Sequence, residues 1–310
     1  MFKSIKSPGL KATFADHGAR LVALEIDGRD VVFGTPLDPD FSKWDNSAGV
    51  TCGRHAGRIS KGGYDLDGER VNLVNNKDGF QLHGGPKGFG SCDWAVTKKG
   101  SELHYTLTSP DGDQGFPGEL KASAVYGLTG NTLWAELTAT TTKPTVINLT
   151  NHAYWNLMGP SAGKDDAFTQ EIQMHASHYL PVDKNLLPLG DIADVTGTKY
   201  DFRKLRAVGQ PYDDCFVMDG KRGELKQVLT MRDPKSNRRM EVWNTESAIQ
   251  FYTALHWSDK IPGKGQTLQQ HQAIAIEPQN VPDAPNNPNF PQSVLRPGRT
   301  YRNRIEWRFS

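Results

Sequence analysis

Apolar and polar residues alternate with a period of two along much of this chain. Residues 120–126 alternate in this way, the pair Gly130-Asn131 follows, and residues 133–139 alternate again. A period of two puts one side of a strand against a core and the other side in solvent. The pattern therefore predicts an antiparallel hairpin with its turn at Gly130-Asn131.

Asp-Gly pairs indicate further turns, because glycine adopts a positive φ without a side-chain penalty. Two such pairs each lie between apolar segments: residues 21–26 and 31–33 around Asp27-Gly28, and residues 64–66 and 71–73 around Asp67-Gly68. Each arrangement predicts a hairpin. Further strands are predicted at residues 216–218 before Asp219-Gly220, near Leu229, Met240 and Ile249, and at residues 304–309.

Helical periodicity is scarce, and no long amphipathic stretch carries helix caps. The 31 glycines and 19 prolines are spread among many short apolar segments. This pattern predicts an all-β fold, a large antiparallel β-sandwich. The Pro- and Asn-rich segment 278–292 contains apolar anchors at Val281 and Phe290, so we interpret it as a loop of one domain that spans residues 1–310.

Charge and cysteine content limit the possible partners and compartment. The 36 basic and 35 acidic residues give a net charge of +1, which gives no reason to expect a nucleic acid or a membrane as partner. No apolar run approaches the roughly 18–20 residues that a membrane helix needs. Three cysteines and an N-terminus without an apolar signal segment predict a reducing, cytoplasmic location.

Two residues are candidates for proton transfer. His152 lies in the polar and aromatic segment 148–157, although a single histidine in such a segment is more often structural. Glu277 ends the apolar run 273–276, and a carboxyl group at the end of a buried strand can have a raised pKa that suits a general base. A solvated glutamate at a strand end explains the same position equally well.

Other polar residues are candidate ligands for hydroxyl groups. They are His83 before Gly84-Gly85, the adjacent acidic residues Asp213 and Asp214, and the arginines Arg54 and Arg58. Each could instead be a turn residue or an ion-pair partner. The chain has no Cys-x-x-Cys or His-Glu-x-x-His motif and no complete phosphate-binding loop, so the sequence predicts no metal site.

Five motifs in the order of the chain resemble the aldose 1-epimerase (galactose mutarotase) family. They are Gly53-Arg54-His55-Ala56-Gly57-Arg58-Ile59, Leu82-His83-Gly84-Gly85, the segment from Asn148 to Leu157, Gln250-Phe251-Tyr252-Thr253, and Glu277-Pro278-Gln279 followed by Pro282-Asp283-Ala284. The resemblance covers nearly the whole chain. It implies the galactose mutarotase-like supersandwich fold.

The resemblance also implies a role for each matching residue. Glu277 matches the catalytic base, acting as a carboxylate, and His152 the catalytic acid, acting as an imidazolium. The positions expected to bind the substrate are Arg58, His83, Asp213 and Gln250. The implied reaction interconverts the anomers of a small aldose. It is redox-neutral and requires no cofactor, and we expect a monomer or homodimer.

Three departures from the family motifs bear on the choice of sugar. Gly57 occupies a position where the family usually has asparagine, Asp214-Cys215 replaces His-Asn, and Trp155 replaces phenylalanine. Galactose is therefore not assumed to be the substrate.

Other functions remain open alongside this one. A hexose-6-phosphate 1-epimerase would need a cationic cluster, for which Arg54, Arg58, Lys61 and Lys87 are the candidates. A glycosidase would use Asp213 and Glu277 as its pair of carboxyl groups. The same sandwich could also be a sugar-binding or sensing module without turnover, because a fold does not fix a function.

Overall fold

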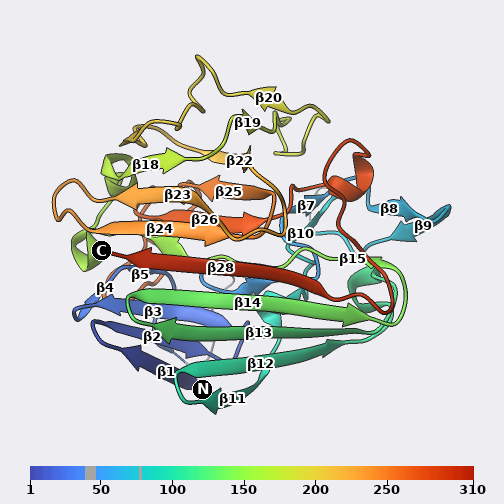
Figure 1. The fold of residues 1–310 in the computed structure, drawn as a ribbon, viewed down its shortest axis with the longest axis horizontal. Coiled ribbons are helices and arrows are strands. Elements are labelled where there is room, and N and C mark those ends of the chain that lie inside the picture. The colour runs from blue at the N-terminus through green and yellow to red at the C-terminus, as the bar shows by residue number, and fades with distance from the viewer. Residues whose placement is uncertain (39–46, 77–78) are drawn as a thin grey trace.

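The computed structural model describes residues 1–38, 47–76 and 79–310. Two large antiparallel sheets dominate this part of the chain (Figure 1). In spatial order, the strands of the nine-stranded sheet are β11 (Ala95–Lys99), β12 (Glu102–Ser109), β13 (Leu120–Thr129), β14 (Thr132–Thr141), β28 (Tyr301–Phe309), β24 (Arg239–Asn244), β23 (Lys226–Arg232), β18 (Glu171–Met174) and β21 (Arg206–Ala207).

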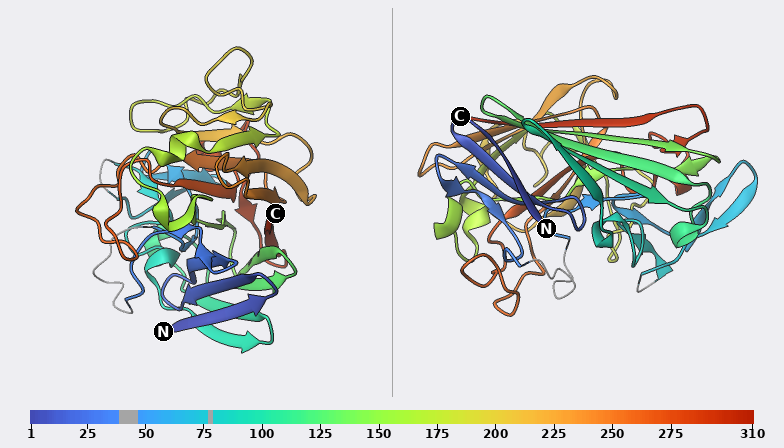
Figure 2. Two further views of the ribbon diagram at one scale, coloured as in Figure 1. Left: turned by 90° about the vertical axis from the view of Figure 1, so that its left-hand side faces the viewer. Right: turned by 90° about the horizontal axis from the view of Figure 1, so that it is seen from below.

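The second large sheet has seven strands in the described residues and combines segments from distant parts of the chain. In spatial order they are β20 (Ala193–Asp194), β19 (His178–Tyr179), β22 (Asp213–Val217), β25 (Ala248–Tyr252), β26 (Ile274–Gln279), β17 (Tyr154–Trp155) and β5 (Val32–Phe33). Figure 2 shows this sheet and the strongly curved nine-stranded sheet from two further directions.

Smaller sheets complete the described architecture. A four-stranded sheet contains β1 (Phe2–Ser7), β2 (Leu10–Ala15), β3 (Arg20–Ile26) and β4 (Arg29–Asp30). Two-stranded pairs are formed by β6 (Thr51–Cys52) with β16 (Thr150–Asn151), β7 (Arg58–Ile59) with β10 (Gln81–Leu82), β8 (Gly63–Leu66) with β9 (Glu69–Asn72), and β15 (Thr145–Val146) with β27 (Val294–Leu295). The β8–β9 hairpin projects from the body at the right of Figure 1.

The helices of the described residues are short 3₁₀ turns. They are η3 (Phe89–Ser91), η4 (Asp113–Gly115), η5 (Gly159–Ser161), η6 (Asp166–Thr169) and η7 (Ala284–Asn286). None of the helices in the described ranges has the length and apolar character needed to cross a bilayer. The prediction of an all-β antiparallel sandwich is confirmed.

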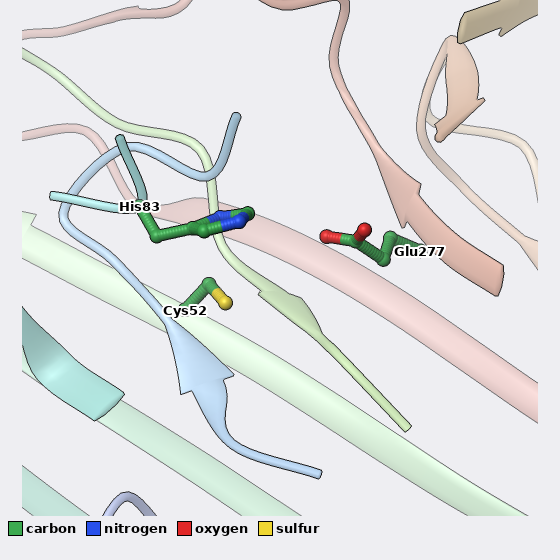
Figure 3. Close-up of side chains that lie close together, drawn as sticks. All are labelled: Cys52, His83 and Glu277. Carbon is green, nitrogen blue, oxygen red and sulfur yellow. The ribbon is translucent and has the colours of Figure 1, made fainter. Parts of the chain in front are cut away.

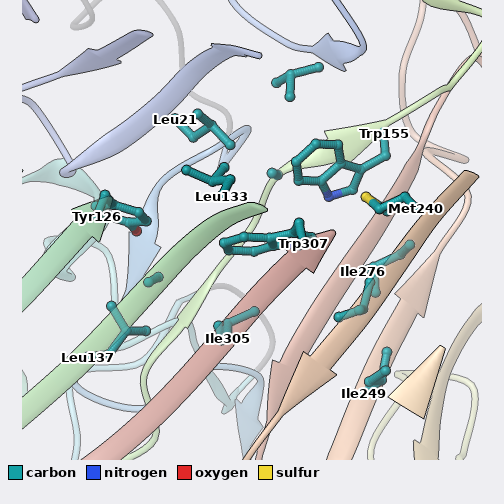
Figure 4. Close-up of a cluster of buried hydrophobic side chains, with 14 of the residues drawn as sticks. Leu21, Tyr126, Leu133, Leu137, Trp155, Met240, Ile249, Ile276, Ile305 and Trp307 are labelled. Atoms are coloured by element: carbon teal, nitrogen blue, oxygen red, sulfur yellow. The ribbon is translucent and has the colours of Figure 1, made fainter. Parts of the chain in front are cut away.

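The main core fills the space between the two large sheets. Apolar side chains of β14 and β28, such as Leu133 and Trp307, meet those of β25 and β26, such as Ile249 and Ile276 (Figure 4). The ring centroids of Trp155 and Trp307 lie 5.8 Å apart. This contact packs β17 against β28 of the opposite sheet. Burial of this apolar surface is the main driving force that holds one face of each sheet against the other.

Most of the predicted hairpins are present. β13 and β14 pair up to Thr129 and Thr132, so that Gly130 and Asn131 form the turn. β8 and β9 flank Asp67-Gly68 in the same way. The hairpin predicted around Asp27-Gly28 is only partly correct: β4 returns along β3, but β5 leaves that sheet and pairs with β17 in the seven-stranded one.

Candidate active site

One face of the seven-stranded sheet carries three of the predicted site residues. Glu277 of β26 lies opposite Gln250 of β25, and Asp213 of β22 lies opposite Tyr252 of β25. Opposite residues on neighbouring strands share a face, as do residues two positions apart on one strand. Asp213, Gln250 and Glu277 therefore face away from the main core, and Gln250 Nε2 donates to Asp213 Oδ1 at 2.7 Å.

Glu277 is more deeply placed than the sequence pattern indicated. It was expected at the end of its strand, but β26 continues through Gln279, and Glu277 is only 2% exposed. Its neighbour Ile276 points into the main core, so the alternation along β26 fixes the carboxyl group on the opposite face. This position holds a carboxyl group away from bulk solvent.

His152 contacts Glu277 directly. His152 Nε2 lies 3.3 Å from Glu277 Oε1. The backbone N–H of His152 donates to Val50 O at 2.9 Å, and its carbonyl oxygen accepts from Gly49 N at 2.8 Å. These two hydrogen bonds fix the backbone of the segment between β16 and β17. They therefore fix the position from which the His152 side chain extends.

His83 lies beside His152, with the two ring centroids 5.2 Å apart and the rings nearly perpendicular. Gly57 N donates to His83 Nδ1 at 3.3 Å, and His83 N donates to Gly57 O at 3.0 Å. Because Nδ1 accepts a hydrogen bond, the neutral ring carries its proton on Nε2 and can donate it to a ligand. Figure 3 shows the His83 ring and the Glu277 carboxyl group pointing toward each other, with Cys52 beside them.

Arg58 adds a cation to the group. Its Nη2 lies 3.9 Å from Asp213 Oδ2, and both side chains keep 17% of their surface exposed. Its guanidinium carbon lies 5.8 Å from the centre of the Phe80 ring, within the range of a cation–π contact. The structure thus brings together all six predicted residues: the buried pair Glu277 and His152, and the more exposed Arg58, His83, Asp213 and Gln250.

Burial favours the neutral form of each member of the central pair. Burial raises the pKa of Glu277 well above its usual value, the Asp213 carboxylate adds to this, and Arg58 opposes it. Burial lowers the pKa of His152 to about 4, and the Arg20 charge also lowers it. The expected carboxylate–imidazolium pair and the neutral pair that burial favours each hold one proton. They differ only in which of the two residues carries it.

The sequence analysis did not single out the aromatic side chains next to this pair. Tyr154 stacks on His152 with 5.0 Å between ring centroids, and the ring centroid of Trp257 lies 4.4 Å from that of Tyr154. Tyr252 contacts Tyr154 edge-on at 6.1 Å. The signal was available for Tyr154, because residues 152 and 154 lie two positions apart in an extended segment and so share a face.

Three other residues are placed where they do not contact the pair. Arg54, a candidate sugar ligand, is 2% exposed and donates to Ser109 Oγ and to the carbonyl oxygens of Ser109, Pro110 and Pro117. Trp155 points into the main core, and Asp214 faces the side of its sheet opposite to Asp213. The departures at Trp155 and Asp214 therefore lie off the face that carries Glu277, whereas Cys215, which pairs with Gln250, and Gly57, which donates to His83 Nδ1, lie at it.

A set of possible metal ligands overlaps this site. The set contains the sulfur of Cys52, a ring nitrogen of His83 and a carboxyl oxygen of Glu277. These three atoms all lie within 4.8 Å of one another. This set includes two of the predicted site residues, and Cys52 was not predicted to take part.

The aldose 1-epimerase family model matches residues 3–308 of the chain. Galactose mutarotase from Homo sapiens is 34% identical over 320 residues, covering 99% of this chain and 93% of that protein. Aldose 1-epimerase from Escherichia coli (strain K12) is 32% identical over 323 residues, covering 97% of this chain and 92% of that protein.

A solved aldose epimerase homologue from C. elegans superposes with a TM-score of 0.92 at 31% identity, covering 100% of this chain and 98% of that chain. Galactose 1-epimerase from Lactobacillus acidophilus superposes with a TM-score of 0.88 at 27% identity, covering 99% of this chain and 93% of that chain. The chain belongs to the aldose 1-epimerase family, whose members are isomerases, and it has the fold of the galactose mutarotases.

Proposed function

We propose that this protein is an aldose 1-epimerase that interconverts the α and β anomers of a free aldose by opening and closing the sugar ring. The observation that carries the proposal is the contact between His152 Nε2 and Glu277 Oε1 at 3.3 Å, on a sheet face that also presents Asp213 and Gln250. An acid and a base are thus adjacent to groups that bind hydroxyls. A positioned acid or base of this kind accelerates proton transfer roughly 10²–10⁴-fold.

Ring opening moves one proton onto the pair and one proton off it. The Glu277 carboxylate accepts the proton of the C1 hydroxyl, and His152 Nε2–H protonates the ring oxygen. The bond between C1 and the ring oxygen breaks, and C1 becomes the aldehyde carbon. Rotation about the C1–C2 bond then exposes the other face of the aldehyde, and ring closure reverses both transfers.

The electrostatics of the site fit this cycle. Opening converts the ionic pair into a carboxylic acid and a neutral imidazole, which is the arrangement that burial favours. Within the described ranges, Glu277 Oε2 is buried and has no hydrogen-bond partner. A sugar hydroxyl that donates to this oxygen favours the carboxylate, and so supports the ionic arrangement from which opening starts.

The remaining residues hold the sugar while C1 changes. Asp213 accepts hydrogen bonds from hydroxyls, and Arg58 and His83 Nε2–H donate to hydroxyl or ring oxygens. Gln250 keeps the Asp213 carboxylate in place through its 2.7 Å hydrogen bond. Binding energy holds the sugar in one orientation and so offsets part of the entropic barrier to the reaction.

A free aldose suits the site better than a sugar phosphate. Arg54, one of the four cations considered for a phosphate, makes its hydrogen bonds to the segment 109–117. Arg58 already faces the Asp213 carboxylate, which would repel a phosphate dianion.

Exchange spectroscopy by proton NMR tests this proposal on freshly dissolved α-anomers. Free aldoses and hexose 6-phosphates are compared at equal concentration, each against a buffer blank. We expect acceleration for at least one free aldose and a smaller effect on its 6-phosphate. Acceleration of the 6-phosphate alone would assign the other substrate class, and acceleration of neither would support a binding protein.

A further inference from the structure

Three segments that are distant in the sequence bring a thiol, an imidazole and a carboxyl group together. Cys52 ends β6, His83 follows β10, and Glu277 lies in β26. One ligand atom of each lies within 4.8 Å of the ligand atoms of the other two (Figure 3). Sulfur, imidazole nitrogen and carboxylate oxygen are the ligands with which proteins bind Zn²⁺ and similar soft or borderline divalent ions.

The distances between the three ligand atoms are close to those found around a coordinated metal ion. Ligand bonds of about 2.0–2.3 Å in tetrahedral geometry place ligand atoms about 3.5 Å apart. The 4.8 Å limit for this set therefore requires movements of about 1 Å, which side-chain rotation can supply.

The backbone around two of the ligands is tightly fixed. A Cβ on Gly84 would lie 1.9 Å from the Gly53 carbonyl oxygen, so the residues that follow His83 and Cys52 are in direct backbone contact. Phe89 N donates to the same Gly53 oxygen at 3.0 Å. The distance between the Cys52 and His83 backbones is thus set by packing, and only the side chains need to adjust.

We propose that Cys52, His83 and Glu277 form a binding site for one thiophilic divalent cation such as Zn²⁺ or Cd²⁺, and that a bound cation excludes the sugar. The three protein ligands leave a fourth coordination position for water. The Cys52 proton passes to solvent as the sulfur–metal bond forms, and the proton that Glu277 shares with His152 moves to His152, so that Glu277 binds the cation as a carboxylate. Exclusion of the sugar rests on the proposed function, because it requires Glu277 and His83 to bind the substrate, whereas cation binding by itself does not.

Ultraviolet absorption during titration with Cd²⁺ tests the binding directly, because thiolate coordination to Cd²⁺ gives a charge-transfer band. The comparison is between the wild-type protein and its Cys52→Ala variant, with Cys215→Ala as the matched control, since Cys215 is also buried but packs among Leu180 and Ala248. We expect a band that saturates at one equivalent in the wild type and in Cys215→Ala, and that is lost in Cys52→Ala. Equal spectra for wild type and Cys52→Ala would overturn the proposal.

Inhibition of anomer exchange by Zn²⁺ gives the second measurement. We expect inhibition that is competitive with the aldose and at least tenfold weaker in Cys52→Ala, which itself keeps its anomer exchange. A Cys52-dependent band in a protein without anomer exchange would retain the cation site and reject the proposed function. Normal exchange with the same Zn²⁺ sensitivity in both proteins, and no Cys52-dependent band, would reject the cation site alone.

Discussion

His152 Nε2 and Glu277 Oε1 lie 3.3 Å apart, and both side chains are almost completely removed from solvent. Two backbone hydrogen bonds hold His152, and the alternation along β26 holds Glu277. A buried pair of this kind can pass one proton between its members without taking one from bulk water. In ring opening, Glu277 takes the proton of the C1 hydroxyl and His152 gives a proton to the ring oxygen, and ring closure reverses both transfers.

Replacement of His152 by glutamine removes the proposed acid while keeping a polar side chain of similar length. We expect kcat for anomer exchange to fall roughly 10²–10⁴-fold, because the ring oxygen would leave as an unprotonated oxyanion. His271→Gln is the matched control, since His271 is also 5% exposed but donates through Nδ1–H to Thr253 O at 2.8 Å. Polarimetry on both variants checks the prediction, and an equal loss in the two would attribute the effect to folding.

Asp213→Asn tests the role of this carboxylate in holding the sugar. We expect KM to rise roughly tenfold or more, because hydrogen bonds to charged groups contribute about 1.5–3 kcal/mol, with a smaller change in kcat. An asparagine oxygen can still accept from Gln250, so the local structure should persist. Asp214→Asn, on the other side of the sheet, should leave KM unchanged, and an unchanged KM in Asp213→Asn would remove Asp213 from the binding site.

Arg54→Met tests the structural role of this arginine. Arg54 donates to four acceptors in the segment 109–117 and is 2% exposed. The loss of these bonds leaves buried acceptors without donors, so we expect the free energy of unfolding to fall by about 3 kcal/mol. Denaturant unfolding measures this loss, and the KM of the folded fraction should match the wild type. A raised KM with unchanged stability would make Arg54 a sugar ligand after all.

His55 is expected to make the fold sensitive to acid. It is 1% exposed, and burial lowers its pKa to about 3 from the usual 6.5. In the unfolded chain, His55 therefore binds a proton as the pH falls through about 6.5. In the folded protein, His55 binds this proton only near pH 3. The free energy of unfolding should thus decrease as pH falls through this window, by roughly 1.4 kcal/mol for each pH unit in which only the unfolded state is protonated.

Urea unfolding at several pH values between 7 and 4 measures this dependence. The His55→Leu variant should show a shallower decrease than the wild type. An identical slope in His55→Leu would assign the acid sensitivity to other groups.

The sequence predicted local structure well where strand and turn lie next to each other in the chain. The β13–β14 hairpin is an example, because alternation and the Gly130-Asn131 turn specify it without any distant contact. The partner of β5 could not be predicted in this way. Val32 and Phe33 are apolar in either sheet, and only the tertiary pairing with β17 decides where they lie.

The site residues were found through motifs rather than through their local pattern. Arg54 and Arg58 are four residues apart in one motif, yet one is enclosed by the segment 109–117 and the other faces Asp213. Cys52 gave no signal because its proximity to His83 and Glu277 exists only after three distant segments have packed together. Burial of the pair, which sets its preferred protonation, likewise depends on the whole fold.

The most direct test of the account is the rate of anomer exchange in Glu277→Gln, measured by exchange NMR together with sugar binding. Glu246→Gln is the matched control, because Glu246 is also buried but pairs with Arg222. We predict that Glu277→Gln still binds the aldose but loses its acceleration over the buffer blank, while Glu246→Gln keeps it. Exchange at the wild-type rate in folded Glu277→Gln would contradict the central claim.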